Sequence, residues 1–220
     1  MFKLNKYYFL RFLILKNLIE KKKISFKKIY NFLLTQKSYY LKSHKAGYAP
    51  VMMNFELWNE CNESCVFCRS NIGEIFNLNP KSNDKISKGK LDIEVYEKII
   101  DELKDYLILS IPYINGEPFL SKNLYRAVEY SSKNNVGSLI ASNGIIINDR
   151  NARRILDSGL DFLKVHISGF TQDIHSIEHR KGDVEMIKKN LENITNLNKK
   201  GKYNCMIMLD FIHYKHNDHQ

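Results

Sequence analysis

Apolar and polar residues alternate along this chain with two different periods. Steps of three and four residues, the period of a helix with one buried face, occupy the segments 92–107, 120–128, 149–157, 171–177 and 184–201. Short apolar runs typical of strands lie around them, at 51–58, 107–114, 136–141, 162–167 and 204–211. Strands that alternate with helices predict a parallel sheet with helices outside it, which is an α/β fold.

A separate helical pattern precedes the first predicted strand. Apolar residues at helical spacing predict one helix around residues 8–19. Ser25 is a suitable N-cap for a second helix, in which we expect Ile29, Phe32 and Leu33 to form the buried face. These two helices predict an extension that packs onto the core.

Charge is concentrated in this extension. We assign residues 1–50 to a basic helical extension, 51–211 to the core and 212–220 to a polar tail. The formal net charge is +10, and residues 1–50 hold twelve Lys or Arg against the single acid Glu20, so the rest is close to neutral. A basic arm can contact nucleic acid, an anionic membrane or an acidic partner. No aromatic-spaced nucleic-acid motif accompanies it, so we favour a solvated pair of basic helices.

We do not expect the apolar stretch near the start of the sequence to be a signal peptide. The apolar stretch at 9–19 is interrupted by Arg11 and Lys16 and is followed by no small-residue cleavage site. No run reaches the roughly 18–20 apolar residues of a membrane span. Three clustered cysteines suit a reducing compartment and a metal site. We therefore expect a cytoplasmic protein.

Polar motifs directly follow four of the predicted strands. They are the cysteine segment, Asn115-Gly116-Glu117-Pro118, Ser142-Asn143-Gly144 and Ser168-Gly169. In a βα barrel the carboxyl ends of the strands carry the chemistry, so we expect a functional site at this edge. Residues 69–90 form a long polar loop that we expect beside the site. Pro112 predicts a bulge in the second strand, because proline has no N–H to donate.

The cysteine segment has the spacing Cys61-x3-Cys65-x2-Cys68. Three thiolates on a short loop can hold three irons of a cubane cluster and leave the fourth iron open. The alternative is a zinc site, but zinc usually takes four ligands and no His or Cys follows at a finger-like distance. Cys205 is remote, and its apolar neighbours predict a buried structural thiol.

The motif, with Phe67 just before its last cysteine, resembles the signature of the radical S-adenosylmethionine (radical SAM) enzymes. The resemblance implies a [4Fe-4S] cluster on the three cysteines, and S-adenosylmethionine (SAM) bound at the open iron through its amino and carboxylate groups. It implies reductive cleavage of SAM to a 5′-deoxyadenosyl radical, with electrons from a flavodoxin- or ferredoxin-like donor. The fold implied is a partial (β/α)6 TIM-like barrel, of which five strands are visible here.

Gly116 and Glu117 resemble the family's Gly-Gly-Glu-Pro element, whose backbone and acid meet the amino group of SAM. Asn115 stands where the family usually has its first glycine. Asparagine tolerates left-handed backbone better than most residues, so we expect the turn to persist. The alternative is an ordinary Gly-Pro turn.

Four more residues match positions that contact SAM in this family. Ser142 precedes Asn-Gly on the SAM and substrate side, Ser168 commonly contacts the ribose, and Phe67 lies beside the adenine. Arg180 resembles an arginine that reaches the SAM carboxylate, which a guanidinium fork suits well. Taken alone, Ser168 could be a helix-start turn, Arg180 a surface charge and Phe67 a core side chain.

The substrate and the completeness of the barrel stay open at this stage. Peptide modification and cofactor or sugar biosynthesis both suit the visible edge. The sequence ends after the fifth strand, so we expect either a shortened or split member of the family or a partner that completes the barrel. The alternative function is a truncated, non-catalytic iron–sulfur module or a subunit that needs a partner. His213, His216 and His219 fall in the tail, where we expect solvated disorder.

Overall fold

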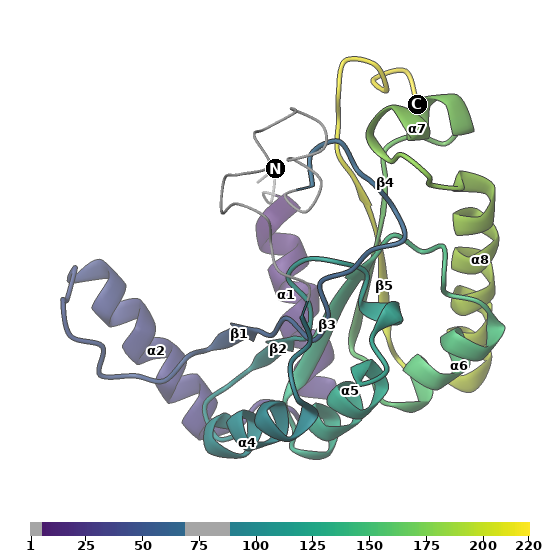
Figure 1. Ribbon diagram of the computed structural model, residues 1–220. Coiled ribbons are helices and arrows are strands. Elements are labelled where there is room, and N and C mark those ends of the chain that lie inside the picture. The colour runs from purple at the N-terminus through teal and green to yellow at the C-terminus, as the bar shows by residue number, and fades with distance from the viewer. Residues whose placement is uncertain (1–5, 69–88) are drawn as a thin grey trace.

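The computed structural model describes residues 6–68 and 89–220 and has a five-stranded parallel sheet at its centre (Figure 1). In the order β1-β2-β3-β4-β5, the strands are Met52–Asn54, Leu109–Ile111, Gly137–Ser142, Phe162–Ile167 and Met206–Phe211. The helices are α1 (Lys6–Glu20), α2 (Phe26–Tyr40), α4 (Ile93–Leu103), the 3-10 turn η1 (Pro118–Leu120), α5 (Leu124–Lys133), α6 (Asp149–Asp157), α7 (Gln172–Glu178) and α8 (Val184–Gly201). The predicted α/β fold is confirmed.

One face of the sheet carries the main core. Helices α4, α5, α6 and α8 pack against it through their apolar stripes (Figure 1). Alternate residues of β4, Leu163, Val165 and Ile167, lie in this core, because strand side chains point to opposite faces in turn. The buried hydroxyl of Tyr96 lies 2.8 Å from Ser110 Oγ and 2.6 Å from Ser131 Oγ, which satisfies its polar end.

The second strand is shorter than its apolar run. The segment 107–114 predicts eight residues of strand, but β2 ends at Ile111 and Pro112 lies just outside it. The expected bulge at Pro112 is wrong, since the strand stops before a residue that cannot donate to a ladder. Tyr113 N donates to Ile111 O instead, in a tight turn directly after the strand.

Helix α1 packs on the face of the sheet opposite the main core. Leu18 is 1% exposed and forms a second apolar cluster with Leu109, Ile111 and Phe162. Gly137, at the start of β3, leaves room for this helix, because a Cβ there would lie 2.7 Å from Leu18 Cδ2. The extension is therefore part of the packed structure. In the described part of the chain, no helix is long and apolar enough to cross a membrane.

Lysines hold the extension to the amino-terminal ends of the strands. Asp161, which is fully buried, accepts from Lys23 Nζ at 2.7 Å and from Ser138 N at 2.8 Å, and it lies 3.0 Å from Lys21 Nζ. Lys28 Nζ donates to the carbonyls of Lys23 and Asn135. Burial lowers the pKa of Lys28 to about 8. The expectation of a solvated basic pair is therefore wrong for these three lysines, because buried acceptors hold them.

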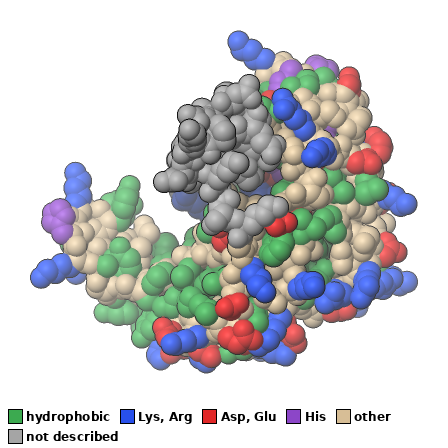
Figure 2. All heavy atoms as spheres, in the orientation of Figure 1, with side chains coloured by type: hydrophobic (Ala, Val, Ile, Leu, Met, Phe, Trp, Pro, Cys, Tyr) green, Lys and Arg blue, Asp and Glu red, His purple; other side chains and the backbone are tan. Residues whose placement is uncertain are grey.

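The second helix turns a polar face inward. Lys28 and Asn31 are buried in α2, whereas Ile29, Phe32 and Leu33 are exposed, so the expected apolar face is wrong. The reason is hydrogen bonding, because Asn31 donates to Ala49 O and accepts from Ala49 N. Exposed apolar side chains of this helix are visible on the left of Figure 2.

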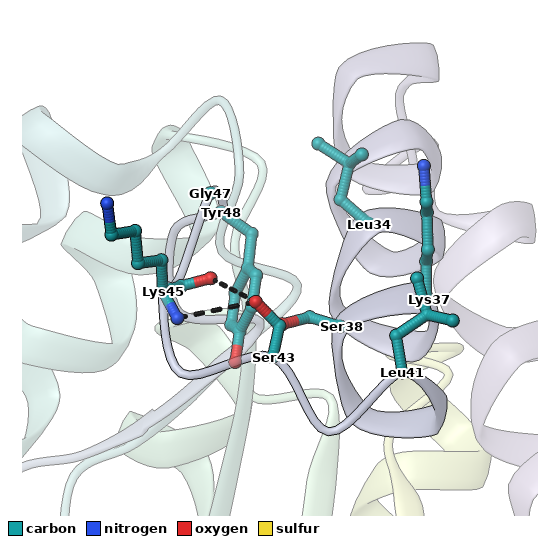
Figure 3. Close-up of a pocket in the computed structure, with 8 residues that line it drawn as sticks. All are labelled: Leu34, Lys37, Ser38, Leu41, Ser43, Lys45, Gly47 and Tyr48. Carbon is teal, nitrogen blue, oxygen red and sulfur yellow. Dashed lines mark hydrogen bonds between the residues drawn. The ribbon is translucent and has the colours of Figure 1, made fainter.

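A shallow pocket lies where the chain leaves α2. Leu34 and Lys37 of α2, Leu41 just after it and Tyr48 in the loop line this pocket, and Ser43 hydrogen-bonds to Lys45 (Figure 3). None of the residues predicted to bind SAM or metal lines this pocket. It belongs to the extension.

The tail is ordered, which corrects the expectation of solvated disorder. Asn217 is fully buried and donates through Nδ2 to the carbonyls of Ser168 and Ile212. Gln220 accepts from Phe170 N and donates to Thr171 Oγ1. These bonds attach the tail to the loop after β4.

We expect Lys23→Met to lower the free energy of unfolding by about 3 kcal/mol, because it leaves part of a buried charge on Asp161 unpaired. Urea unfolding followed by circular dichroism measures this change. Lys27→Met is the matched control, because Lys27 pairs with Asp105 at the surface, where both side chains are mostly exposed. Equal losses in the two variants would show that the buried pair does not hold the extension.

Candidate cluster and SAM site

The cysteine loop follows β1 and is attached to a segment far away in the sequence. Ser64 N donates to Arg180 O at 3.0 Å, and Val66 N donates to Glu178 O at 2.9 Å. Both carbonyls belong to the end of α7 and the turn after it. Two backbone bonds therefore fix the loop against the region that follows β4.

The three cysteines of the loop are available as ligands. Cys61 is exposed, Cys65 and Cys68 are half-buried, and none of them forms a disulfide. Glu63 N donates to Cys61 Sγ at 3.5 Å, and Asn143 Nδ2 lies 3.8 Å from the same sulfur. Although the residue as a whole is exposed, the protein atoms around its sulfur desolvate the thiolate and raise the pKa of Cys61 to about 11, and a bound metal would replace the thiol proton.

A buried acid and a histidine contact the second cysteine. His179 Nδ1 lies 2.9 Å from Glu63 Oε2, and Cys65 Sγ lies 3.3 Å from each of these atoms. Burial, followed by the charge of Glu63, raises the pKa of Cys65. His179 also stacks on His175, with ring centroids 4.6 Å apart. Sequence reasoning missed Glu63 and His179, because His179 is 114 residues from Cys65.

Gly116 lies directly against the backbone of the cysteine loop. Its φ is +74°, and a Cβ there would lie 2.6 Å from Glu60 O and 2.8 Å from the carbonyl carbon of Asn59. Glu117 N donates to Glu60 O at 2.9 Å. The turn persists with Asn115 in place of glycine, because the left-handed conformation falls on Gly116. Asn115 instead donates through N and Nδ2 to Glu56 Oε1.

Glu117 joins the ends of β2 and β3. Its carboxylate is buried and accepts from Phe119 N, Ser142 Oγ and Asn143 N at 2.9–3.1 Å. Burial raises the pKa of Glu117 to about 7, and the three donors oppose that shift. Glu117 and Ser142, both expected at the SAM site, are thus hydrogen-bonded to each other. Both carboxylate oxygens of Glu117 accept hydrogen bonds from other residues of the protein.

The remaining predicted contacts lie around the histidines. Ser168 is fully buried and donates its N–H to His175 Nδ1, while its Oγ has no hydrogen-bond partner among the residues that the structure describes. Phe67 is 48% exposed and meets the His179 ring edge-on at 5.5 Å. Arg180 exposes its side chain and contributes its carbonyl to the loop. The predicted loop at 69–90 falls almost entirely outside the described residues.

Three polar side chains that the sequence analysis does not single out lie together on β4 and β5, on the face of the sheet opposite the main core. Asp210 Oδ2 lies 2.7 Å from Lys164 Nζ and 3.2 Å from His166 Nδ1. The His166 ring lies 4.9 Å from that of His179, which places the group beside the cysteine loop. The sequence contains an indication of this group, because polar residues alternate with apolar ones at 162–167 and alternate strand residues share a face.

The three thiols fit an iron–sulfur cluster with one open iron. They share one short loop, backbone and amide N–H groups reach Cys61, and the adjoining edge offers polar side chains. Cys205 does not take part, because it is 5% exposed and lies in the main core.

Comparison with known proteins agrees with this geometry. The family model of the radical SAM superfamily matches residues 55–215. Mycofactocin maturase MftC of Mycobacterium ulcerans is 27% identical over 146 residues, which are 66% of this chain and 37% of that protein. Fe-coproporphyrin III synthase of Methanosarcina barkeri is 23% identical over 156 residues, 70% of this chain and 37% of that protein.

Solved structures show the same fold. The structure of Streptococcus suis SuiB bound to its precursor peptide SuiA superposes with a TM-score of 0.58 at 11% identity, and it covers 76% of this chain and 34% of that one. The chain thus spans little more than a third of the length of these relatives. The chain belongs to the radical SAM superfamily, whose members bind a [4Fe-4S] cluster and SAM.

Proposed function

We propose that Cys61, Cys65 and Cys68 hold a [4Fe-4S] cluster and that SAM binds at its fourth iron. The observation that carries this proposal is three cysteines without disulfides on one loop at the carboxyl edge of a parallel sheet. The chemistry that cluster and SAM supply when bound is one-electron cleavage of SAM to methionine and a 5′-deoxyadenosyl radical, which abstracts a hydrogen atom from substrate. A flavodoxin- or ferredoxin-like protein is the proposed electron donor.

The chain's own residues would position SAM around the loop. The exposed ring of Phe67 can pack on the adenine, and the exposed guanidinium of Arg180 can pair with the carboxylate. Ser168 Oγ, which is buried without a partner among the described residues, can donate to a ribose hydroxyl. Gly116 keeps the turn after β2 close to the loop, and its backbone can approach the amino group.

We propose peptide modification or cofactor biosynthesis as the reaction class. The names of the relatives represent both, since MftC is a maturase of mycofactocin and the Methanosarcina barkeri protein is an Fe-coproporphyrin III synthase. The group of Lys164, His166 and Asp210 lies beside the loop on the face that a substrate would meet. The alternative remains an iron–sulfur module that needs a partner for turnover.

Anaerobic reconstitution with iron and sulfide tests the proposal. We expect a brown protein with about four irons per chain, and release of 5′-deoxyadenosine that depends on both SAM and dithionite. A cluster without SAM cleavage would favour the non-catalytic module. Protein that takes up zinc and no iron under these conditions would contradict the proposal.

Cysteine variants test the ligand assignment. Cys65→Ala should abolish the cluster, because two thiolates remain on the loop. Cys205→Ala is the matched control and should keep its iron, because this thiol lies in the core. Iron content and the visible absorption spectrum report both results. Equal iron loss in the two variants would contradict the assignment.

A glycine pair tests the contact between the turn after β2 and the loop. Gly116→Ala should displace the loop backbone and reduce cluster content several-fold, because its Cβ would meet backbone atoms at 2.6–2.9 Å. At Gly47 a Cβ meets nothing within 4 Å, so Gly47→Ala is the control. Iron content after identical reconstitution compares them. Full cluster content in Gly116→Ala would show that the loop does not depend on this contact.

A further inference from the structure

We propose that the cluster-free protein binds a divalent transition-metal ion, zinc by ligand chemistry, through Cys65 Sγ, Glu63 Oε2 and His179 Nδ1. This inference rests on the proposed function, because Cys65 is shared with the cluster. The sulfur of Cys65 cannot bind an iron of the cluster and the divalent ion at the same time. The loop would therefore hold either the cluster or the divalent ion.

The three ligand atoms already have the spacing of a metal site. Cys65 Sγ is 3.3 Å from both other atoms, and His179 Nδ1 is 2.9 Å from Glu63 Oε2. A tetrahedral zinc with bonds of about 2.0–2.3 Å has ligand atoms roughly 3.3–3.7 Å apart. An ion just outside the plane of the three atoms thus needs shifts of only a few tenths of an ångström. The fourth position stays open to water.

Charge and burial favour a divalent cation. A thiolate and a carboxylate together carry two negative charges, which one M²⁺ ion neutralises. The side chains of Glu63 and His179 are 1% and 4% exposed, so these charges are poorly screened by water. Glu63 Oε1 is buried without a partner among the described residues. A buried acceptor without a donor is uncommon, so the charge of this carboxylate is only partly compensated, and an ion bound at Oε2 would neutralise it.

The fold holds the three side chains in place before any ion arrives. The two backbone bonds from Ser64 and Val66 fix the loop to the residues on either side of His179. His175 stacks on the His179 ring with planes 7° apart. Gly182 lets the backbone pass close to these side chains, because a Cβ there would lie 2.7 Å from His175 Nε2 and 3.0 Å from Glu63 Oε1. The site is therefore preorganised.

The fold supplies zinc ligands that the cysteine spacing alone does not show. No close ligand follows the cysteines in sequence, but folding brings one from 114 residues away. Zinc commonly uses Cys, His and carboxylate ligands, and three protein ligands with one open position suffice for it. The divalent site uses one cysteine of the loop, whereas the cluster uses three.

Cobalt binding to the cluster-free full chain tests the proposal without any measurement of SAM cleavage. We expect one cobalt(II) ion per chain, with visible d–d bands and a thiolate-to-cobalt charge-transfer band, and displacement by zinc. Cys61→Ala and Cys68→Ala should keep these bands, although both lose the cluster. Two ligand variants, His179→Phe and Glu63→Gln, should weaken cobalt binding by more than about 100-fold, and the phenyl ring of the first preserves the stack on His175. Loss of a residue that only supports a ligand costs less, about 10–100-fold in metal affinity.

His166→Phe is the matched control, because its ring lies 4.9 Å from that of His179 but His166 does not belong to the group of three ligands. It should bind cobalt like the unchanged protein, and circular dichroism verifies that each variant is folded. Preloading with zinc should slow cluster assembly, and His179→Phe should remove that delay. Cobalt that is lost in Cys61→Ala or Cys68→Ala but retained in folded His179→Phe and Glu63→Gln would overturn the proposal. A chain without cobalt binding would overturn it as well, whether or not the cluster forms.

Discussion

Two backbone hydrogen bonds, from Ser64 N to Arg180 O and from Val66 N to Glu178 O, hold together the parts of the proposed site. The parallel sheet brings the carboxyl ends of β1 and β4 to the same edge, but it does not orient the loop that follows β1. These bonds do, and they place His179 beside Cys65. The turn after β2 holds the start of the loop, because Glu117 N donates to Glu60 O and Gly116 lies against the same backbone. The loop is therefore held at two places.

Much of this arrangement follows from local sequence patterns. Helical and strand periodicities depend on residues a few positions apart, so the order of elements and the parallel sheet could be predicted. The cysteine spacing is also local, and the edge motifs follow because parallel strands end together. The end of the strand after α4 does not follow from its apolar residues, because the apolar run continues past Pro112 while the ladder stops at Ile111.

What could not be predicted depends on partners distant in sequence. The Glu63–His179 pair joins residues 116 positions apart, and the bond between Lys23 and Asp161 spans 138. No period or motif marks such pairs. The same reason explains α2. Its buried face is polar because Asn31 Nδ2 donates to Ala49 O and Lys28 Nζ donates to Asn135 O. Asn217 likewise orders the tail through a carbonyl of the loop after β4.

The site combines a loop that offers three sulfurs with a sheet edge that carries the polar side chains of Glu117, Ser142 and Ser168. The most direct measurement is the electron paramagnetic resonance spectrum of the reconstituted, dithionite-reduced chain before and after addition of SAM. We expect a reduced-cluster signal whose shape changes when SAM is added, because one iron carries no cysteine. A spectrum that SAM leaves unchanged would contradict SAM binding at the cluster.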